Sequence, residues 1–398
     1  MKNSRILLRQ FSRPNTQVNV LLPSVILALA SLVFWTSVHA VPKVSTRSAQ
    51  SLKTVVVKFN EAFPNLNARF LGFADRRTAL FVAEKRNKQN EGSIIRWDAF
   101  NSKIVGELPL SPWISVFNLR LSPDGRYLAT TSNPSSLKFK IPKAYNFTIL
   151  SSSNLKTVVT QNIKEDEYCS GVLFSPDRLN QVIVKMRERV PYEDTFIAGR
   201  GYLDIFDINS RKITHTIPYH PGFEADRIVP TADGKSWLMI YYSFFFNNFG
   251  EAGLEEEQDQ GATIDVINPK TGKIEWHIPS AKNLTVGDPV IPFSRQEFVS
   301  SASIFNCVKR TSRPWAVSKL RLSPESPISE IPGKPQFVVL PTKTGFKIRN
   351  WIKGKDIKSW QVKGMAGRAF FSPDLRTIGY RQGQQMSFFT FDPTLLKP

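Results

Sequence analysis

Basic side chains gather in three long polar segments of the chain, where they could bind anions. Ammonium and guanidinium groups donate charge-assisted hydrogen bonds to phosphate, sulfate and carboxylate oxygens. The candidate binding residues are Lys85, Arg86, Lys88, Lys138, Lys140, Lys143, Arg187 and Arg189. A fourth long segment, 243–261, is rich in Phe and Glu instead, so we expect a basic sector beside an acidic one. Solvated loops without a ligand are the alternative interpretation of these charge runs.

Motifs of the common catalytic chemistries are absent from the sequence. There is no G-x-S-x-G elbow, no H-E-x-x-H helix, no Walker A loop and no G-x-G-x-x-G turn. Two cysteines, Cys169 and Cys307, are too few for a thiolate zinc site. They could form one disulfide or remain two buried thiols. We therefore predict no catalytic residue, no resident cofactor and no metal site.

The elements that must position the basic segments follow a repeat of strand, tight turn and strand. Five copies carry a turn aspartate: Asp75, Asp124, Asp177, Asp233 and Asp374. The first four are spaced by 49, 53 and 56 residues, and the last gap of 141 leaves room for two degenerate copies. Segments 291–299 and 330–339 fill those places. Asp, Pro, Ser and Gly suit such turns because they bond or bend the local backbone.

A second strand–turn–strand pattern follows most copies of the first, so each unit has four antiparallel strands, a to d. The pattern recurs at 93–108, 145–160, 202–217, 263–278, 346–362 and 386–396. Four strands per unit of about 50 residues predict an all-β fold, a single β-propeller of seven four-stranded blades. Segment 302–332 fits the pattern poorly, which leaves the blade count there open. Long b–c connections at 84–92, 132–144, 186–199 and 243–261 would then lie on one face of the propeller.

The segment Ile95-Arg96-Trp97-Asp98, followed by a polar turn, resembles a WD repeat. Other units replace Trp-Asp with Phe206-Asp207, Ile267-Asn268 and Phe391-Asp392. The Gly-His dipeptide of eukaryotic WD repeats is missing, so we expect that family's His–Asp network to be absent. The chain looks closer to divergent bacterial propellers of the YVTN-type and lactonase-like groups. The resemblance covers about residues 50–398 and implies the fold far more than a function.

The two ends of the propeller region complement each other. The last unit supplies strands a, b and c, and segment 51–59 (SLKTVVVKF) has the pattern of the missing fourth strand. We therefore predict that this segment joins the last blade and closes the ring, which removes exposed sheet edges. The predicted domain is 51–398.

Two functions remain open for a propeller of this kind. The first is a non-catalytic platform that binds an anionic partner through the long loops. The alternative is a propeller enzyme, such as a lactonase-like hydrolase or a cofactor-using dehydrogenase, with polar groups in the central channel. The channel candidates are Asp226, Arg227, Asp288 and Arg368, and structural pairing is the interpretation we favour for them.

The N-terminal residues have the pattern of a secretory signal peptide. Four basic residues lie within 1–13, an apolar core spans 25–35, and Val38-x-Ala40 fits the cleavage rule. We predict a signal peptide over 1–40, a linker over 41–50 and an extracytoplasmic protein, periplasmic or secreted. An uncleaved anchor is the alternative. The mature chain would have no transmembrane span.

The charge of the chain favours an anionic partner. Its formal net charge is +20, from 53 Lys and Arg against 33 Asp and Glu. Without the four basic residues of the predicted signal, 49 remain against 33, or a net +16. A protein or an anionic polymer or membrane surface is the expected partner. Nucleic acid is not expected, because no nucleic-acid-binding module is recognisable.

Overall fold

The computed structural model describes only part of the 398-residue chain. The described residues are 54–64, 66–85, 92–110, 118–131, 145–164, 166–176, 180–192, 195–218, 223–231, 234–243, 262–281, 290–292, 297–300, 303–306, 309, 311–314, 328–334, 336–362 and 367–397. They all belong to one compact unit, Ser51–Pro398. The predicted signal peptide and linker lie outside the described residues.

Six four-stranded antiparallel sheets are each made from strands that follow one another along the chain. The first three sheets contain β2 (Leu66–Phe73), β3 (Thr78–Lys85), β4 (Gly92–Asp98) and β5 (Lys103–Pro109); β6 (Arg120–Leu121), β7 (Tyr127–Thr131), β8 (Tyr145–Ser151) and β9 (Thr157–Ile163); and β10 (Glu167–Phe174), β11 (Gln181–Tyr192), β12 (Thr195–Asp207) and β13 (Lys212–Pro218). The next three contain β14 (Phe223–Pro230), β15 (Trp237–Ser243), β16 (Ala262–Ile267) and β17 (Ile274–Ala281); β18 (Val290–Pro292), β19 (Glu297–Ser300), β20 (Ser303–Asn306) and β21 (Thr311–Pro314); and β22 (Ser329–Glu330), β23 (Phe337–Thr342), β24 (Gly345–Asn350) and β25 (Lys355–Gln361).

A seventh sheet combines strands from both ends of the unit, in the order β1-β28-β27-β26. Its strands are β1 (Val55–Lys58), β26 (Arg368–Phe371), β27 (Thr377–Gln382) and β28 (Gln385–Thr390). β1 is antiparallel to β28, in a register that runs from Val55↔Phe388 to Lys58↔Gln385. The one-turn helix α1 (Phe59–Ala62) follows β1, and a 3₁₀ helix, Pro393–Leu396, follows β28.

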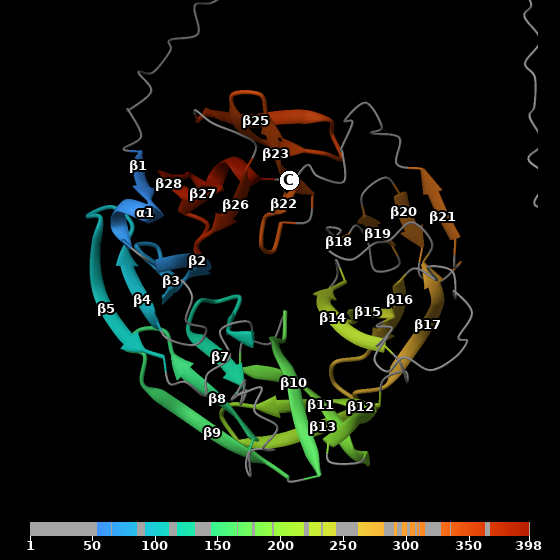
Figure 1. The fold of residues 1–398 in the computed structure, drawn as a ribbon. Helices are drawn as coiled ribbons and strands as arrows, with labels where there is room; N and C mark the ends of the chain where they lie inside the picture. Colours follow the sequence, from blue (N-terminus) through green and yellow to red (C-terminus); the bar gives the residue numbers. More distant parts are fainter. Residues whose placement is uncertain are drawn as a thin grey trace, which may run out of the picture. The chain divides into compact units, whose positions relative to one another are not determined.

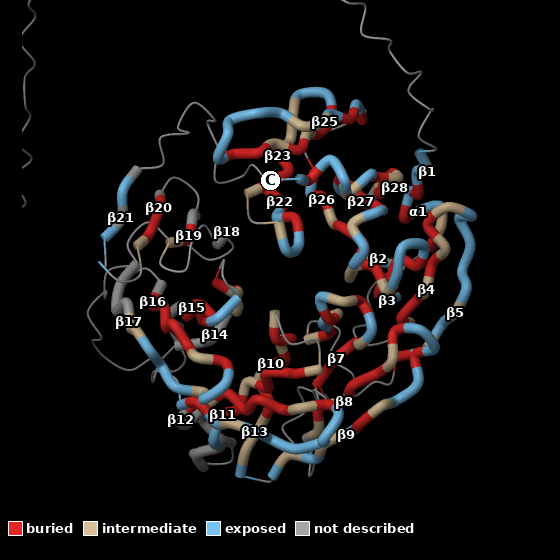
Figure 2. The backbone as a smooth tube through the Cα atoms, turned by 180° about the vertical axis from the view of Figure 1, so that it is seen from behind, coloured by how far each residue is buried: buried red, intermediate tan, exposed pale blue. Residues whose placement is uncertain are grey.

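The sheets follow one another around a central axis (Figure 1). In the first six sheets the first strand is innermost and the fourth outermost, and in the seventh β26 is innermost and β1 outermost. This arrangement is a single all-β propeller, which confirms that part of the predicted fold. Burial follows the same order (Figure 2). In the first sheet, six of the eight residues of β3 are buried, whereas β5 alternates between exposed and half-buried residues. In this sheet the second strand is therefore covered on both faces by neighbouring sheets, whereas the fourth strand faces solvent.

The first and last sheets meet in an aromatic contact, which we call the joint. Phe70 lies edge-on to Phe370 of the last sheet, with ring centroids 4.9 Å apart, and Phe73 lies edge-on to Phe388 at 5.9 Å. Phe59, which directly follows β1, packs on Phe81 at 5.4 Å. Rings of this size bury large areas and prefer such edge-to-face geometry. The joint is therefore a well-packed part of the core.

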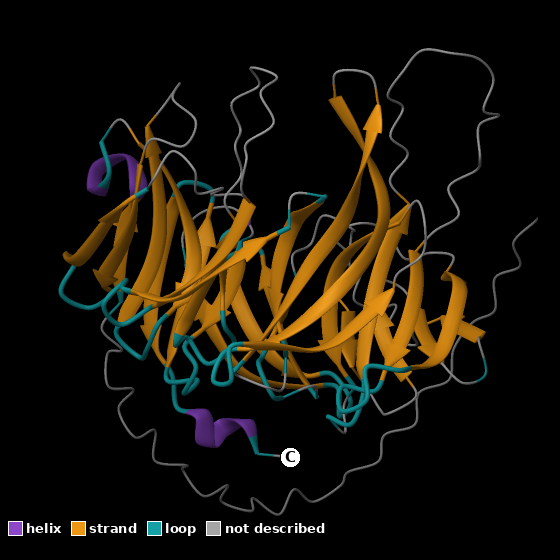
Figure 3. Cartoon of the chain, turned by 90° about the horizontal axis from the view of Figure 1, so that it is seen from below, coloured by secondary structure: helices purple, strands orange, loops and turns teal. Residues whose placement is uncertain are grey.

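The two faces of the ring differ in the connections they carry (Figure 3). We call the end with the β2–β3 and β4–β5 turns the turn face, and the opposite end, where β2 begins and β3 ends, the loop face. The tight turns gather at the turn face, and the C-terminal 3₁₀ helix lies just beyond it. α1 lies at the loop face.

One predicted loop is wrong. Segment 186–199 is mostly strand, because β11 continues to Tyr192 and β12 begins at Thr195. The backbone pairing extends from Arg189↔Ala198 to Tyr192↔Thr195. Val190, Thr195 and Ile197 are β-branched and favour strands, but the charged residues of the segment suggested a loop. After the last strand of the final unit, the chain forms the 3₁₀ helix Pro393–Leu396.

Candidate functional site

The turn aspartates hold the backbone of their own turns. Asp75 Oδ1 accepts hydrogen bonds from the backbone amides of Arg77 (2.7 Å) and Thr78 (2.9 Å). Asp124 and Asp374 likewise accept from the amide two residues ahead, at 3.2 and 3.0 Å. These carboxylates are used in structure, as their turn chemistry predicts, and are poor candidates for catalysis.

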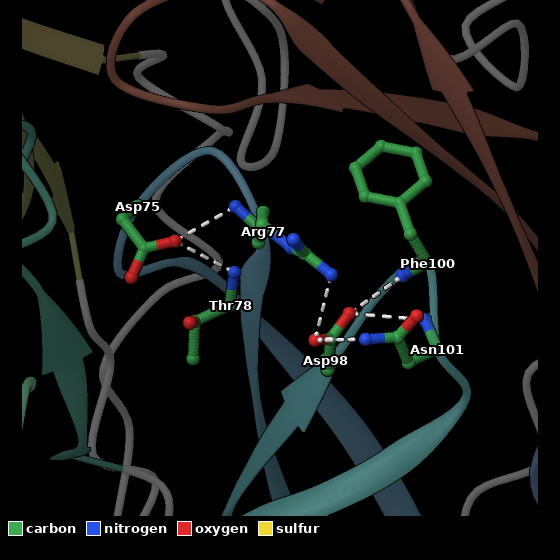
Figure 4. Close-up of polar contacts among 6 residues, drawn as sticks. All are labelled: Asp75, Arg77, Thr78, Asp98, Phe100 and Asn101. Atoms are coloured by element: carbon green, nitrogen blue, oxygen red, sulfur yellow. Dashed lines mark hydrogen bonds and ion pairs between the residues drawn. The ribbon is translucent and has the colours of Figure 1, made fainter.

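The aspartate of the WD-like dipeptide has a similar role (Figure 4). Asp98 Oδ1 accepts from the backbone amides of Phe100 and Asn101, each at 3.0 Å, and Arg77 donates to Oδ2 at 3.2 Å. Burial alone would raise the pKa of Asp98, but these hydrogen bonds and the Arg77 charge outweigh it and hold the pKa below its usual value. Asp98 is thus an ionised carboxylate that joins the β2–β3 and β4–β5 turns.

An Asp–His pair lies between β16 and β17. His277 Nδ1 and Asp265 Oδ1 are 2.7 Å apart, and Asp265 is fully buried. The same position relative to the bulge between the third and fourth strands holds a polar pair in the two preceding sheets. These pairs are Thr148–Thr160 at 3.2 Å and Asp204–Thr216 at 2.6 Å. Because the position recurs with different chemistry, the pair is a repeated strand-to-strand contact and gives no sign of a catalytic dyad.

The predicted binding residues fall into three groups. Lys85 is exposed at the end of β3, on the loop face. Arg187 is only 6% exposed and lies within β11, so the prediction that it belongs to a loop is wrong. The backbone of Arg189 also belongs to β11. The other five lie outside the described residues: Arg86, Lys88, Lys138, Lys140 and Lys143.

The residues of the enzyme alternative lie on β14, on β26 or outside the described residues. Asp226 lies at a bulge of β14, and Arg227 pairs with Ile240 of β15. Arg368 is the first residue of β26, and its guanidinium lies 5.6 Å from the centre of the Phe370 ring. Asp288 lies outside the described residues.

Three arginines that sequence reasoning missed lie on the first or second strands of three sheets. We call Arg69, Arg120 and Arg381 the arginine cluster; they lie on β2, β6 and β27. Arg368 lies beside the cluster, because it is the direct cross-strand neighbour of Arg381. Arg69 and Arg381 are half-buried, and Arg120 and Arg368 are exposed. Three sheets therefore contribute cations to one region.

Packing shows that these strands are neighbours. A Cβ placed on Gly72 of β2 would come within 2.6 Å of Leu121 Cδ2, which belongs to β6. On the other side of β2, Phe70 packs on Phe370 of β26. β2 thus lies between β26 and β6.

Neighbouring cations influence the pKa of Arg69. Burial lowers the pKa of the Arg69 guanidinium, and repulsion from Arg120 and Arg381 lowers it further. Glu84, on β3, acts in the opposite direction. Burial also lowers the pKa of Arg381. Guanidinium groups that repel one another in a partly dry environment gain free energy when an anion binds between them.

A signal for two of the three arginines, Arg69 and Arg120, exists in the sequence. Arg69, Arg227 and Arg368 each stand six residues before the aspartate of their turn, and Arg120 stands four residues before Asp124. The repeat therefore places an arginine on several inner strands. The loop cations were predicted as binding residues because they form runs. These arginines, in contrast, are single residues in apolar strands.

Two further findings concern the described residues alone. Among them, no group of three or more His, Cys, Asp and Glu side chains lies close enough to hold a metal ion. No helix in the described ranges has the length and apolar character needed to cross a bilayer.

Comparison with known proteins gives no family for this chain. No protein-family model and no curated protein sequence matches it. Among solved structures, it is similar to a chain of the "Crystal Structure of Mitotic Checkpoint Complex". The identity is 9%, the TM-score is 0.49, and the match covers 92% of this chain and 100% of that chain. The propeller arrangement rests on the strand pairing of this chain itself, and the likeness assigns no function.

Proposed function

We propose that this protein is an exported propeller that serves as a non-catalytic binding platform for an anionic partner. The partner we expect first is a protein with an acidic surface, and an anionic polymer or membrane surface is the alternative. The basic head, short apolar core and small-residue exit of residues 1–40 support export. The net charge of +16 that remains after this segment supports attraction of an anionic partner.

We further propose that the seven sheets are seven blades of a closed ring, with β1 as the closing strand. The pairing of β1 with β28 and the burial of Phe59 directly after β1 support this closure. A closed ring fixes the inner strands relative to one another, and binding groups on rigid elements lose little conformational entropy when a partner binds.

The arginine cluster is the observation that carries the proposed function. Its three cations come from three different sheets, so only the folded ring brings them together. Lys85 adds an exposed cation at the end of β3, next to Glu84. The described turn aspartates and Asp98 accept hydrogen bonds from backbone amides, so these carboxylates have a structural role.

Heparin-affinity chromatography of the mature protein, for which we expect Val41 as the first residue, tests this proposal. The triple variant Arg69→Gln, Arg120→Gln, Arg381→Gln removes three charges from the cluster. The control Arg76→Gln, Arg211→Gln, Arg376→Gln removes three exposed charges from the turn face. We expect the cluster variant to elute at clearly lower salt than the control, because clustered charges bind a polyanion more tightly than scattered ones. Equal elution of both variants would contradict the proposal.

A further inference from the structure

We propose that the turn face docks onto a bilayer that contains anionic phospholipids. In the docked state its cations lie at the level of the phosphate groups, and its exposed apolar side chains enter the interface. This inference goes beyond the proposed function, because it concerns a different surface of the propeller and does not depend on the arginine cluster.

A lysine recurs where the fourth strand of a sheet begins. In the five sheets whose turn between the third and fourth strands is fully described, the first residue of the fourth strand or the residue just before it is a lysine. We call these exposed residues the rim lysines: Lys103, Lys156, Lys212, Lys273 and Lys355. Because the fourth strand is outermost in these sheets, the rim lysines lie around the outer edge of the turn face (Figure 1).

Other cations of the turn face add to the rim lysines. Further exposed Lys and Arg side chains lie in the described turns or just after them: Arg76, Arg211, Lys270, Lys309, Lys353, Arg376 and Lys397. The six aspartates of the described turns each accept a hydrogen bond from a backbone amide: Asp75, Asp98, Asp124, Asp207, Asp374 and Asp392. Twelve exposed cations therefore stand against six carboxylates that are used within their own turns.

The described part of the loop face has a different distribution of charge. Lys58 pairs with Glu61 at 2.7 Å, and Lys164 lies 3.7 Å from Glu167. Cations there lie beside carboxylates that offset them. An anionic surface is therefore attracted more strongly to the turn face.

Exposed apolar side chains accompany the cations of the turn face. Ile352 lies in the turn between β24 and β25 with 55% of its surface exposed, directly before Lys353. Leu395 of the C-terminal 3₁₀ helix is 39% exposed. Three more exposed isoleucines directly follow rim lysines: Ile104, Ile213 and Ile274. Apolar side chains beside lysines suit the boundary between lipid headgroups and acyl chains, where both kinds of group find favourable surroundings.

The spread of the cations favours a bilayer as the partner. The rim lysines belong to five different sheets around the ring, so they do not converge on one compact anion. An anionic leaflet attracts every Lys or Arg that lies near it, and these contributions need no convergence. An acidic protein would pair with some of the charges but would offer no hydrocarbon to the exposed isoleucines. A broad surface that is anionic and partly apolar fits both features.

Vesicle sedimentation tests the attraction. The mature protein from Val41 onwards, which lacks the apolar segment 25–35, is mixed with vesicles of equal parts phosphatidylcholine and phosphatidylglycerol. We expect the wild type to sediment with these vesicles and to be released by salt, and to bind weakly to vesicles of phosphatidylcholine alone. No binding to the anionic vesicles, or equal binding to both kinds, would overturn the proposal.

Two charge variants identify the face that binds. The rim variant replaces four exposed lysines: Lys103→Gln, Lys212→Gln, Lys273→Gln and Lys355→Gln. Its partition onto anionic vesicles should weaken about tenfold or more. The control replaces four exposed lysines of the loop face: Lys58→Gln, Lys85→Gln, Lys164→Gln and Lys343→Gln. The control should weaken about threefold or less, because charges far from the leaflet are screened. Equal losses in the two variants would show that net charge alone attracts the vesicles and would overturn the assignment to this face.

A third variant tests the apolar contact. Ile352→Thr combined with Leu395→Thr should weaken binding about threefold or more, because less apolar surface leaves water. Val56→Thr changes an exposed residue of β1, away from the turn face, and should bind like the wild type. If the threonine pair also binds like the wild type, no apolar contact with the bilayer exists and the docked arrangement is wrong.

Hydrogen exchange on vesicles reports the orientation. The backbone amides of turns 99–102, 208–211 and 351–354 should exchange more slowly when the protein is bound, whereas those of α1 at the loop face should not change. Slower exchange confined to α1 would show that the opposite face docks and would overturn the proposal. Binding of polyglutamate that depends on the rim lysines, without binding to vesicles, would assign the turn face to an acidic protein instead.

Failure of this inference can be told apart from failure of the proposed function. The cluster variant Arg69→Gln, Arg120→Gln, Arg381→Gln should bind vesicles like the wild type, because its charges lie away from the turn face. If vesicles bind through the rim lysines but heparin elution is indifferent to the cluster, the docking face stands and the platform function does not. If heparin elution depends on the cluster and vesicles do not bind, the opposite holds.

Discussion

Single residues in this protein show how position decides the use of a charged group. Asp98 is partly buried but satisfied by two backbone amides and Arg77, so it stays ionised. Asp204 is more deeply buried, with 8% of its surface exposed, and Thr216 Oγ1 donates to it at 2.6 Å. Burial raises the pKa of Asp204, nearby Glu167 raises it further, and the Thr216 hydrogen bond and Lys164 only partly offset this.

Asp204→Asn should therefore stabilise the protein at neutral pH. The raised pKa means that the folded state holds a proton on Asp204 more readily than the unfolded state, whose pKa is about 3.9. The stabilisation from that proton is complete below the unfolded pKa and is lost as pH rises through the folded pKa. Asparagine does not titrate and still accepts from Thr216.

Urea unfolding at pH 7.5 and at pH 4 measures the effect. The variant should be more stable than the wild type at pH 7.5, and the difference should shrink at pH 4. Asp166→Asn removes an exposed carboxylate from the same sheet region and is the control, for which little change is expected at either pH. A destabilised Asp204→Asn variant at pH 7.5 would show that the charged form is the favoured one.

At the scale of the element, the joint depends on close packing against a strand glycine. Gly379 lies in β27, where a Cβ would come within 2.2 Å of Met386 Cε and 3.1 Å of Phe73 Cζ. Both neighbours are buried core residues, with 0% and 2% of their surface exposed. Phe73 belongs to the first sheet, so the glycine allows the two sheets to approach each other.

Gly379→Ala should lower the free energy of unfolding by about 1–3 kcal/mol, the usual range for overpacking a core. Gly106→Ala is a matched control in β5, where the added Cβ meets only the flexible side chain of Arg96, at 3.3 Å. That control should change stability by about 0.5 kcal/mol or less. Chemical denaturation of both variants checks the difference. Equal stability of the two variants would show that the joint is looser than its contacts indicate.

The sequence predicted elements well where the repeat is regular. Turn aspartates and alternating strands located the sheets around Asp75, Asp124 and Asp374, because turn chemistry and strand period are local properties. The strands β20 and β21 were not predicted, since each has four residues and little apolar alternation. The extension of β11 and β12 into segment 186–199 was missed because the charged residues there suggested a loop. Arg187 was misplaced with it.

At the scale of the whole molecule, the propeller places strands that are far apart in the sequence side by side. Segment 51–59 was predicted to complete the last unit, and β1 pairs with β28. The arginine cluster could not be predicted, because it depends on which inner strands are neighbours and on how deeply each guanidinium is buried. Those are properties of the assembled ring. Five of the eight predicted loop cations lie outside the described residues. The proposed function therefore rests on the arginine cluster.

The most direct measurement is an experimental structure of the protein from crystals soaked in sodium tungstate, a heavy analogue of a tetrahedral oxyanion. Anomalous scattering locates tungsten without ambiguity among the side chains. We expect a peak within hydrogen-bond reach of the Arg69 and Arg381 guanidinium groups, with Arg120 beside it. Tungsten found only at the turn face, or nowhere on the inner strands, would contradict an anion-binding function for this propeller.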